Sequence, residues 1–235
     1  MSASVSSRTI ILERIRIANK VSTVDAYREL PRNYILSGSL DEPARVGLMM
    51  ERLREYGAEV AECVPEQLGA AIAAQLAFSG RHNFAAPADI SPAWLVPGFK
   101  WTLDSALATD EIEHQDGVLT SAFAGVADSG TIVLHHSGGE GRRVLSLLPD
   151  WHLCILRISR IVETLPEYFH LCSQPPALAP ALATFISGPS ATADIEMTRI
   201  KGVHGPRSLS VILVHDHNQH EAGEIPSPTD TGRRP

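Results

Sequence analysis

The chain has 235 residues, of which 44% are hydrophobic, and its 20 Lys and Arg residues against 27 Asp and Glu residues give a formal net charge of -7. This length and apolar content are enough to form one sizeable core, and the acidic balance argues against a surface that neutralises nucleic-acid phosphates. The first residues lack the apolar stretch of a signal peptide, and no run of about 18 uncharged apolar residues is present, so we expect a cytoplasmic chain without a membrane span.

Three cysteines, Cys63, Cys154 and Cys172, lie far apart in the sequence. Their odd number and spacing match neither a disulfide framework nor a CxxC metal motif. An iron–sulfur cluster usually needs four thiolates, and the chain also lacks the GxGxxG, GxxxxGKS/T and GxSxG motifs. The sequence therefore predicts no metal site and no cofactor in this chain, so that another chain must hold the electrons in any oxidation.

The first predicted helix runs from Arg8 to about Lys20, where Ile11, Leu12 and Ile15 recur at short helical steps between charges. We expect residues 1–30 to form an N-terminal amphipathic helical segment that packs on the domain or on a partner.

A second helix is predicted from Asp41 to Tyr56, with Pro43 in its first turn and Gly57 at its end. A short strand from Ala58 to Val64 and a helix from Pro65 to Phe78 follow. This alternation of strand and helix is typical of a parallel sheet covered by helices.

The apolar residues from Arg81 to His114 have no clear helical or strand spacing, but beyond His114 the spacing again indicates regular elements. A helix is predicted from Leu165 to Cys172. Strands are predicted at Gly117 to Phe123, Thr131 to His135, Trp151 to Arg157, Ala181 to Ser187 and Ser208 to His215. We expect residues 31–215 to form the α/β domain and residues 216–235 to be a disordered polar tail.

The strongest local motif is ISGPSATADIE, in which an apolar strand leads into a turn at Gly188 and a predicted helix start at Thr192. The backbone N–H groups there, with the hydroxyls of Ser190 and Thr192, could hold a carboxylate or phosphate, although Asp194 would oppose an anion unless it points away. The alternative is that these residues only cap the helix.

The motif KGVHGPRSL places His204 beside Gly205, and Arg207 follows. A histidine in such a turn is suited to act as an acid, a base or an anion contact. The arginine adds a planar guanidinium group that stays positively charged. The alternative is a histidine satisfied by a backbone carbonyl.

The segment Asp128, Ser129, Gly130, Thr131 lies between two apolar runs. Its carboxylate could act as a nucleophile or general base, and an ordinary turn would use the same residues. His152 opens a later strand, where it either reaches a crevice or is a half-buried structural histidine.

Taken in order, the stretches AGVADSGTIVL, LLPDWHLCIL, SGPSATADIE and GVHGPRSLSVILV resemble the LUD-domain family in its lactate-utilization protein C branch. The resemblance implies an α/β protein with a three-layer α/β/α fold and a mostly parallel sheet, similar to the sugar-phosphate isomerase and CoA-transferase-like fold. It also implies a part in oxidising L-lactate to pyruvate together with iron–sulfur partner proteins, which would carry the clusters, and a site for a small carboxylate ligand.

Carried onto this sequence, the resemblance implies Asp128 and His204 as catalytic residues. The implied ligand-binding residues are Ser129, Gly130, Thr131, Gly188, Ser190, Thr192, Asp194, Gly205 and Arg207. Relatives often have Glu in place of Asp128 and a basic or larger polar residue in place of Ala191, and these two departures weaken any role that needs a longer or charged side chain. Two other functions stay open: an independent enzyme acting on a phosphorylated or acyl-CoA substrate, and a non-catalytic ligand-binding or assembly protein.

Overall fold

The computed structural model of the chain describes residues 6–19, 29–31, 33–173, 182–193, 199–201 and 205–216. The chain divides into two compact units between Ile35 and Leu36. In the first unit, α1 (Ser7–Asn19) confirms the helix expected from the apolar spacing, and all of its residues are exposed. The division into residues 1–30, 31–215 and 216–235 stays a prediction.

The second unit is built on a parallel sheet of six strands in the order β1-β12-β7-β4-β2-β3. These strands are β1 (Glu59–Cys63), β2 (Asn83–Pro87), β3 (Lys100–Asp104), β4 (Gly117–Ser121), β7 (Trp151–Arg157) and β12 (Ser208–Val214). The central strands β7 and β12 are apolar along nearly their whole length and are buried, as strands covered on both faces of a parallel sheet must be.

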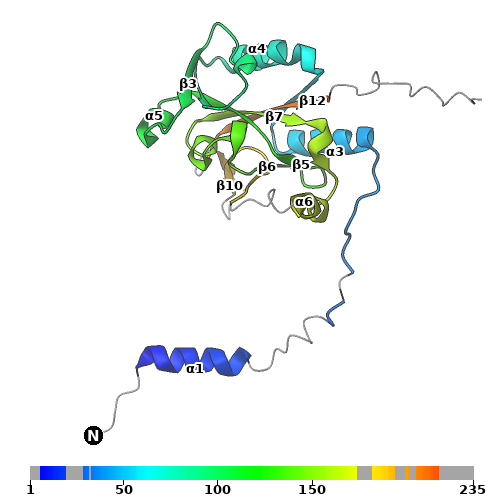
Figure 1. The fold of residues 1–235 in the computed structure, drawn as a ribbon, viewed down its shortest axis with the longest axis vertical. Helices are drawn as coiled ribbons and strands as arrows, with labels where there is room; N and C mark the ends of the chain where they lie inside the picture. Colours follow the sequence, from blue (N-terminus) through cyan, green and yellow to red (C-terminus); the bar gives the residue numbers. More distant parts are fainter. Residues whose placement is uncertain are drawn as a thin grey trace, which may run out of the picture. The chain divides into compact units, whose positions relative to one another are not determined.

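Helices cover both faces of this sheet (Figure 1). On one face, α4 (Leu68–Ser79) packs through Leu68, Ile72 and Leu76. On the other face, α3 (Glu42–Glu55) packs through residues that include Met49 and Leu53. The expected three-layer α/β fold with a mostly parallel sheet is therefore confirmed.

A smaller sheet lies on the same face as α3. Its strands are β5 (Ala124–Val126), β6 (Thr131–Leu134), β8 (Ile161–Val162) and β9 (Thr184–Ile186), in the order β8-β5-β6-β9. Ile132 and Leu134 of β6 share a core cluster with Met49, and α6 (Leu165–Cys172) packs on the opposite side of this sheet through Tyr168.

Local sequence explains the ends of α3. The side chain of Asp41 accepts a hydrogen bond from the backbone N–H of Ala44 at 3.0 Å, and Pro43 lies in the first turn. Gly57 follows the helix with a φ of +83°, a conformation that favours glycine. These residues match the start and end predicted from the sequence.

The remaining described elements are short. They are α5 (Thr109–Glu113), the 3-10 helices at Pro65–Gln67, Pro92–Trp94, Gly138–Glu140, Arg143–Ser146 and Ile158–Arg160, and the hairpin of β10 (Ala191–Ala193) with β11 (Arg199–Lys201). No helix among the described residues is long and apolar enough to span a membrane.

The helix start predicted at Thr192 is wrong, because Thr192 lies within the antiparallel hairpin of β10 and β11. The backbone N–H of Ser190, just before β10, donates to the carbonyl of Pro206 at 2.8 Å. That donor is used within the fold, so the predicted cluster of free N–H groups at a helix N-terminus does not form there.

Candidate functional site

A crevice of about 570 Å³ lies beyond the carboxyl ends of the central strands. Its walls come from the ends of β4 and β7, at Ser121 and Arg157, and from residues just past β2 and β12, at Asp89 and Asp216. In open α/β sheets, ligands bind preferentially outside the carboxyl ends of the strands. We call this site the carboxyl-end crevice.

Two arginines supply positive charge to the crevice. Arg157 lies 3.6 Å from the carboxylate of Asp216, which also accepts a hydrogen bond from the backbone N–H of Ser159 at 2.9 Å. The guanidinium group of Arg160 lies 5.7 Å from the centre of the Phe123 ring. Both arginine side chains are exposed, so each guanidinium can reorient toward a carboxylate or phosphate in the crevice.

Glu140 is the buried acid of the crevice, with only 7% of its surface exposed. One oxygen, Oε2, accepts hydrogen bonds from the backbone N–H groups of His135 and His136. Burial nevertheless raises the pKa of Glu140 to about 7. A carboxyl group with this pKa can accept or donate a proton near neutral pH, as general acid–base catalysis requires.

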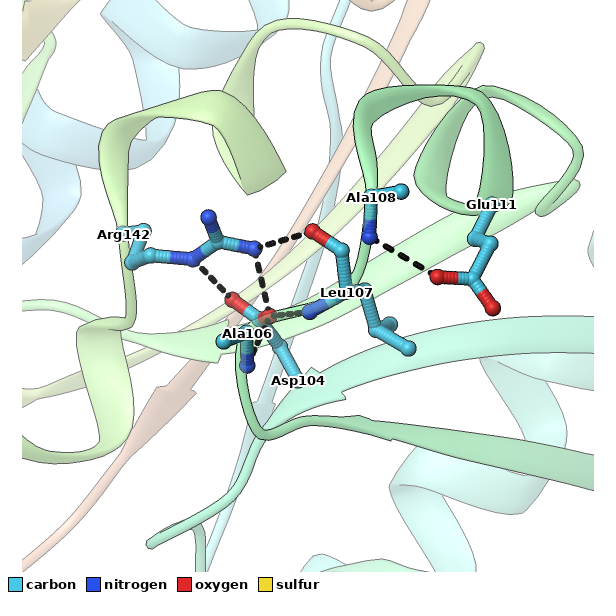
Figure 2. Close-up of polar contacts among 6 residues, drawn as sticks. All are labelled: Asp104, Ala106, Leu107, Ala108, Glu111 and Arg142. Atoms are coloured by element: carbon cyan, nitrogen blue, oxygen red, sulfur yellow. Dashed lines mark hydrogen bonds and ion pairs between the residues drawn. The ribbon is translucent and has the colours of Figure 1, made fainter.

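The segment that carries Glu140 is anchored to the end of β3 (Figure 2). Arg142 donates two hydrogen bonds to the carboxylate of Asp104 at 2.8 and 2.6 Å, and a third to the carbonyl of Leu107 at 2.9 Å. Gly141 lies between Glu140 and Arg142 in the sequence. A Cβ added to Gly141 would lie 2.7 Å from the side chain of Pro87 and 2.7 Å from that of Leu145. These contacts fix where Glu140 enters the crevice.

A partly buried aromatic cluster holds His135, whose backbone N–H binds Glu140. The ring of His135 stacks on Phe123 with 3.6 Å between ring centres, and its Nε2 lies 3.0 Å from the hydroxyl of Tyr168. Burial lowers the pKa of His135, which favours the neutral ring. His135 is thus held in place while its backbone N–H binds Glu140.

The predicted residues Asp128 to Gly130 lie in the turn between β5 and β6, and Thr131 is the first residue of β6, away from the carboxyl-end crevice. Asp128 and Ser129 are exposed. The hydroxyl of Thr131 lies 2.7 Å from the hydroxyl of Ser129 and 2.7 Å from that of Ser187. Two motifs far apart in the sequence therefore meet at Thr131, as a shared site would require.

Gly188, Ser190 and Gly205 line a second pocket, of about 300 Å³, together with His152. The structure thus brings part of the predicted ligand set together, but not at the carboxyl-end crevice. Arg207 lies outside both pockets, exposed and 3.5 Å from the carboxylate of Asp150.

Three further assignments have little or no structural description. Asp194 and His204 lie outside the described residues, and Thr192 is described only as part of β10. The catalytic and ligand-binding roles assigned to these and the other motif residues stay predictions.

Comparison with known proteins places the chain in a family. A family model described as LUD domain matches residues 15–214. The chain belongs to the LUD-domain family.

Named relatives cover most of the chain. Lactate utilization protein C of Deinococcus radiodurans is 39% identical over 165 residues, which span 70% of this chain and 76% of that protein. Lactate utilization protein C of Bacillus licheniformis is 30% identical over 213 residues, or 83% and 88% of the two chains. A crystal structure of a DUF162 family protein from Deinococcus radiodurans is 30% identical, with a TM-score of 0.64 over 75% of this chain and 99% of that one.

In this LUD domain, sequence reasoning missed Glu140, Arg157 and Arg160, three of the charged residues that line the carboxyl-end crevice. One signal was available, because Arg157 ends the apolar run of β7 and so marks the carboxyl end of a central strand. Among the described residues, no group of His, Cys, Asp and Glu side chains is arranged to hold a metal ion.

Proposed function

We propose that this LUD-domain chain is a component of the L-lactate utilization system and assists the oxidation of L-lactate to pyruvate together with iron–sulfur partner proteins. The observation that carries the proposal is its similarity, over most of both chains, to two proteins named lactate utilization protein C. Small-carboxylate chemistry at the carboxyl-end crevice supports it.

In this proposal, Arg157 and Arg160 bind the carboxylate of L-lactate, because paired guanidinium groups suit a planar anion. Glu140, with a pKa near neutrality, exchanges a proton with the substrate hydroxyl. Conversion of L-lactate to pyruvate removes the hydroxyl proton, which Glu140 would accept, and the hydrogen of the α-carbon together with two electrons. The iron–sulfur partner proteins would supply the acceptor for that hydrogen and its electrons.

The cysteines of this chain support the assignment of the clusters to partners. Cys63, Cys154 and Cys172 are all buried, and burial raises the pKa of the Cys154 thiol to about 12. Since the thiolate is the form that binds metal, Cys154 is poorly suited to be a cluster ligand.

Ligand-induced stabilisation tests the crevice. The melting temperature of the purified chain is measured with L-lactate, pyruvate, phosphate and CoA, for the wild type, for an Arg157→Ala/Arg160→Ala variant and for Arg54→Ala, which removes an exposed arginine of α3. A ligand at 100 times its dissociation constant adds about 2.7 kcal/mol of stability. We expect L-lactate or pyruvate to stabilise the wild type and Arg54→Ala but not the double variant.

Growth tests the role in the cell. A strain lacking this chain should grow poorly on L-lactate, and the wild-type gene, but not the double variant, should restore growth. Unimpaired growth of the deletion strain would contradict the lactate role. Restored growth with the double variant would contradict only the assignment of the carboxylate to Arg157 and Arg160.

One observation favours a second function. A crevice of about 570 Å³ is within the range that holds much larger ligands than L-lactate, and Glu140 could serve as a base or nucleophile there. An independent enzyme acting on an acyl-CoA or phosphorylated substrate is therefore the alternative. It predicts stabilisation by CoA or phosphate and none by L-lactate in the same experiment.

A further inference from the structure

The second pocket lies at the opposite end of the same strands. His152 and Leu209 are the second residues of β7 and β12, whereas Arg157 of the carboxyl-end crevice is the last residue of β7. At about 3.3 Å per residue, His152 and Arg157 are about 16 Å apart along the strand. We call this second site the amino-end pocket.

The side chains that β7 contributes to the two sites point to opposite faces of the sheet. Side chains alternate along a strand, and Cys154 of β7 packs in the core cluster on the face of α3, whereas Ile155 packs in the cluster on the face of α4. His152 shares the face of Cys154, while Arg157 shares that of Ile155. The two sites also share no lining residue among those that the structure describes.

His152 is buried, with 1% of its surface exposed, and only one of its ring nitrogens is satisfied. Its Nε2 lies 2.7 Å from the hydroxyl of Thr120, and that hydroxyl donates to the sulfur of Cys154 at 3.8 Å. Since that hydroxyl has a single proton, we assign His152 the tautomer in which Nε2 donates to Thr120 and Nδ1 is left as an acceptor.

Nδ1 of His152 has no hydrogen-bond partner among the described residues. A buried polar atom without a partner destabilises a fold, and such atoms are rare in native proteins. A donor supplied by a bound molecule would remove this penalty, and the amino-end pocket is the cavity that His152 lines.

The rest of the pocket wall indicates what kind of molecule would fit. No Asp, Glu, Lys or Arg side chain is among its described lining residues. Leu147, Phe185, Ile186 and Leu209 supply apolar surface, and Ser146 and Ser187 supply hydroxyls. Burial lowers the pKa of His152 to about 4, so its ring is neutral at pH 7 and offers a lone pair instead of a charge. Among these described residues, a carboxylate, which only accepts hydrogen bonds, would find no counter-charge and no donor at Nδ1.

We propose that the amino-end pocket binds a small uncharged molecule with an apolar body and an O–H or N–H group that donates to Nδ1 of His152. This site is separate from the carboxyl-end crevice and does not depend on the proposed function. Its volume of about 300 Å³ lies at the lower end of the range for small-molecule sites, which suits a single-ring compound.

Three probes that share a benzene ring test the proposal. Phenol has the donor, anisole has the ring without the donor, and benzoate replaces the donor with a charge. Each is titrated into the full chain carrying ¹⁵N-labelled histidine, and the His152 ring resonances are assigned by their loss in His152→Gln. We expect phenol to shift the Nδ1 resonance of His152 and to bind at least tenfold more tightly than anisole or benzoate.

A blocking variant keeps the test valid if His152→Gln fails to fold. Ala191 is exposed and lines the pocket, so Ala191→Phe should fill it without disturbing the core. We expect Ala191→Phe to weaken phenol binding at least tenfold while stabilisation by L-lactate persists. We expect Arg157→Ala/Arg160→Ala to lose stabilisation by L-lactate while phenol binding persists.

Each contrary result overturns the proposal. Equal affinities for phenol and anisole would show that no donor reaches Nδ1. Phenol binding unchanged in Ala191→Phe would place the probe elsewhere. A high-resolution crystal structure grown with phenol that shows only water beside Nδ1 would assign the pocket to solvent. Loss of L-lactate stabilisation alone would count against the proposed function and leave the amino-end pocket in place.

Discussion

Arg142 and Asp104 form a salt bridge with two hydrogen bonds, which joins the segment of Glu140 to the end of β3 (Figure 2). Asp104 is 9% exposed, and it also accepts the backbone N–H groups of Ala106 and Leu107. Its hydrogen bonds with Arg142 are the main cause that lowers the pKa of its carboxyl group. The carboxylate is therefore held ionised by partners on both segments, and it joins two parts of the chain that are 38 residues apart.

Replacing Arg142 with Ala should leave the buried Asp104 carboxylate with only its two backbone donors. Removing one partner of a buried charge is destabilising, and because the Arg142 side chain is half exposed we expect a loss of about 1–3 kcal/mol. Chemical denaturation measures this. The neighbouring Arg143→Ala removes an exposed arginine and should change stability by less than about 0.5 kcal/mol. Equal losses in the two variants would mean that the ion pair contributes nothing specific.

The raised pKa of Glu140 predicts a pH dependence of stability. Its carboxyl group binds a proton more tightly in the folded chain, with a pKa of about 7, than at its ordinary value of 4.5. The stability that this group contributes is therefore complete below pH 4.5 and is lost as the pH rises through about 7. At 1.36 kcal/mol per pKa unit, the loss is at most about 3 kcal/mol.

Glu140→Gln provides the measurement, because the amide oxygen can still accept both backbone N–H groups but does not titrate. Denaturation curves at several pH values should show the wild type losing stability relative to Glu140→Gln between pH 4.5 and about 7. Parallel curves for the two proteins would show that Glu140 titrates at an ordinary pKa and is unsuited to proton exchange at neutral pH.

Regular elements could be predicted from the sequence because their signals are local. The apolar run Trp151–Arg157 and the helix Leu165–Cys172 have the predicted bounds in the structure. The strand β2 could not be predicted, since it has the sequence NFAAP, in which alanine and proline carry little strand preference. Its burial comes from neighbouring strands and helices, which a local pattern does not contain.

The candidate site was harder to predict because long-range contacts build it. Glu140 lies in a glycine-rich turn that reads as a loop, and its burial follows from the anchor at Arg142 and Asp104. The helix start expected at Thr192 is wrong for a similar reason, since Thr192 suits either a cap or a strand and pairing with β11 decides between them.

Gly130, within the predicted ligand motif, should be intolerant of a side chain for packing reasons alone. Its φ is +57°, and an added Cβ would lie 2.5 Å from Cβ of Arg52 and 3.2 Å from the backbone nitrogen of Leu53. Gly138 has a similar φ of +52° with open space around it. Gly138→Ala should cost about 1–2 kcal/mol through backbone strain alone, and Gly130→Ala should cost at least about 1 kcal/mol more, because α3 must move.

Denaturant melts of both glycine variants measure this difference. Similar losses would show that α3 yields easily at Arg52 and that the turn between β5 and β6 is loosely held. The assignment of Ser129 and Thr131 to a ligand site would then lose the rigid support that a preorganised site needs.

His152 should produce a pH dependence of the opposite sign to that of Glu140. Burial lowers the pKa of His152 from 6.5 to about 4, so the folded chain binds its proton more weakly than the unfolded chain does. The stability that depends on the neutral ring is present above pH 6.5 and is lost as the pH falls toward about 4, by at most about 3 kcal/mol.

In His152→Gln this loss on acidification should disappear, whereas His82→Phe, which replaces an exposed histidine, should retain it. Denaturation of the three proteins between pH 7 and pH 4 provides the comparison. If His152→Gln loses as much stability on acidification as the wild type, folding does not lower the pKa of His152 below its ordinary value of 6.5. Nδ1 would then carry a proton below that pH, where the amino-end pocket would select acceptors and anions in place of uncharged donors.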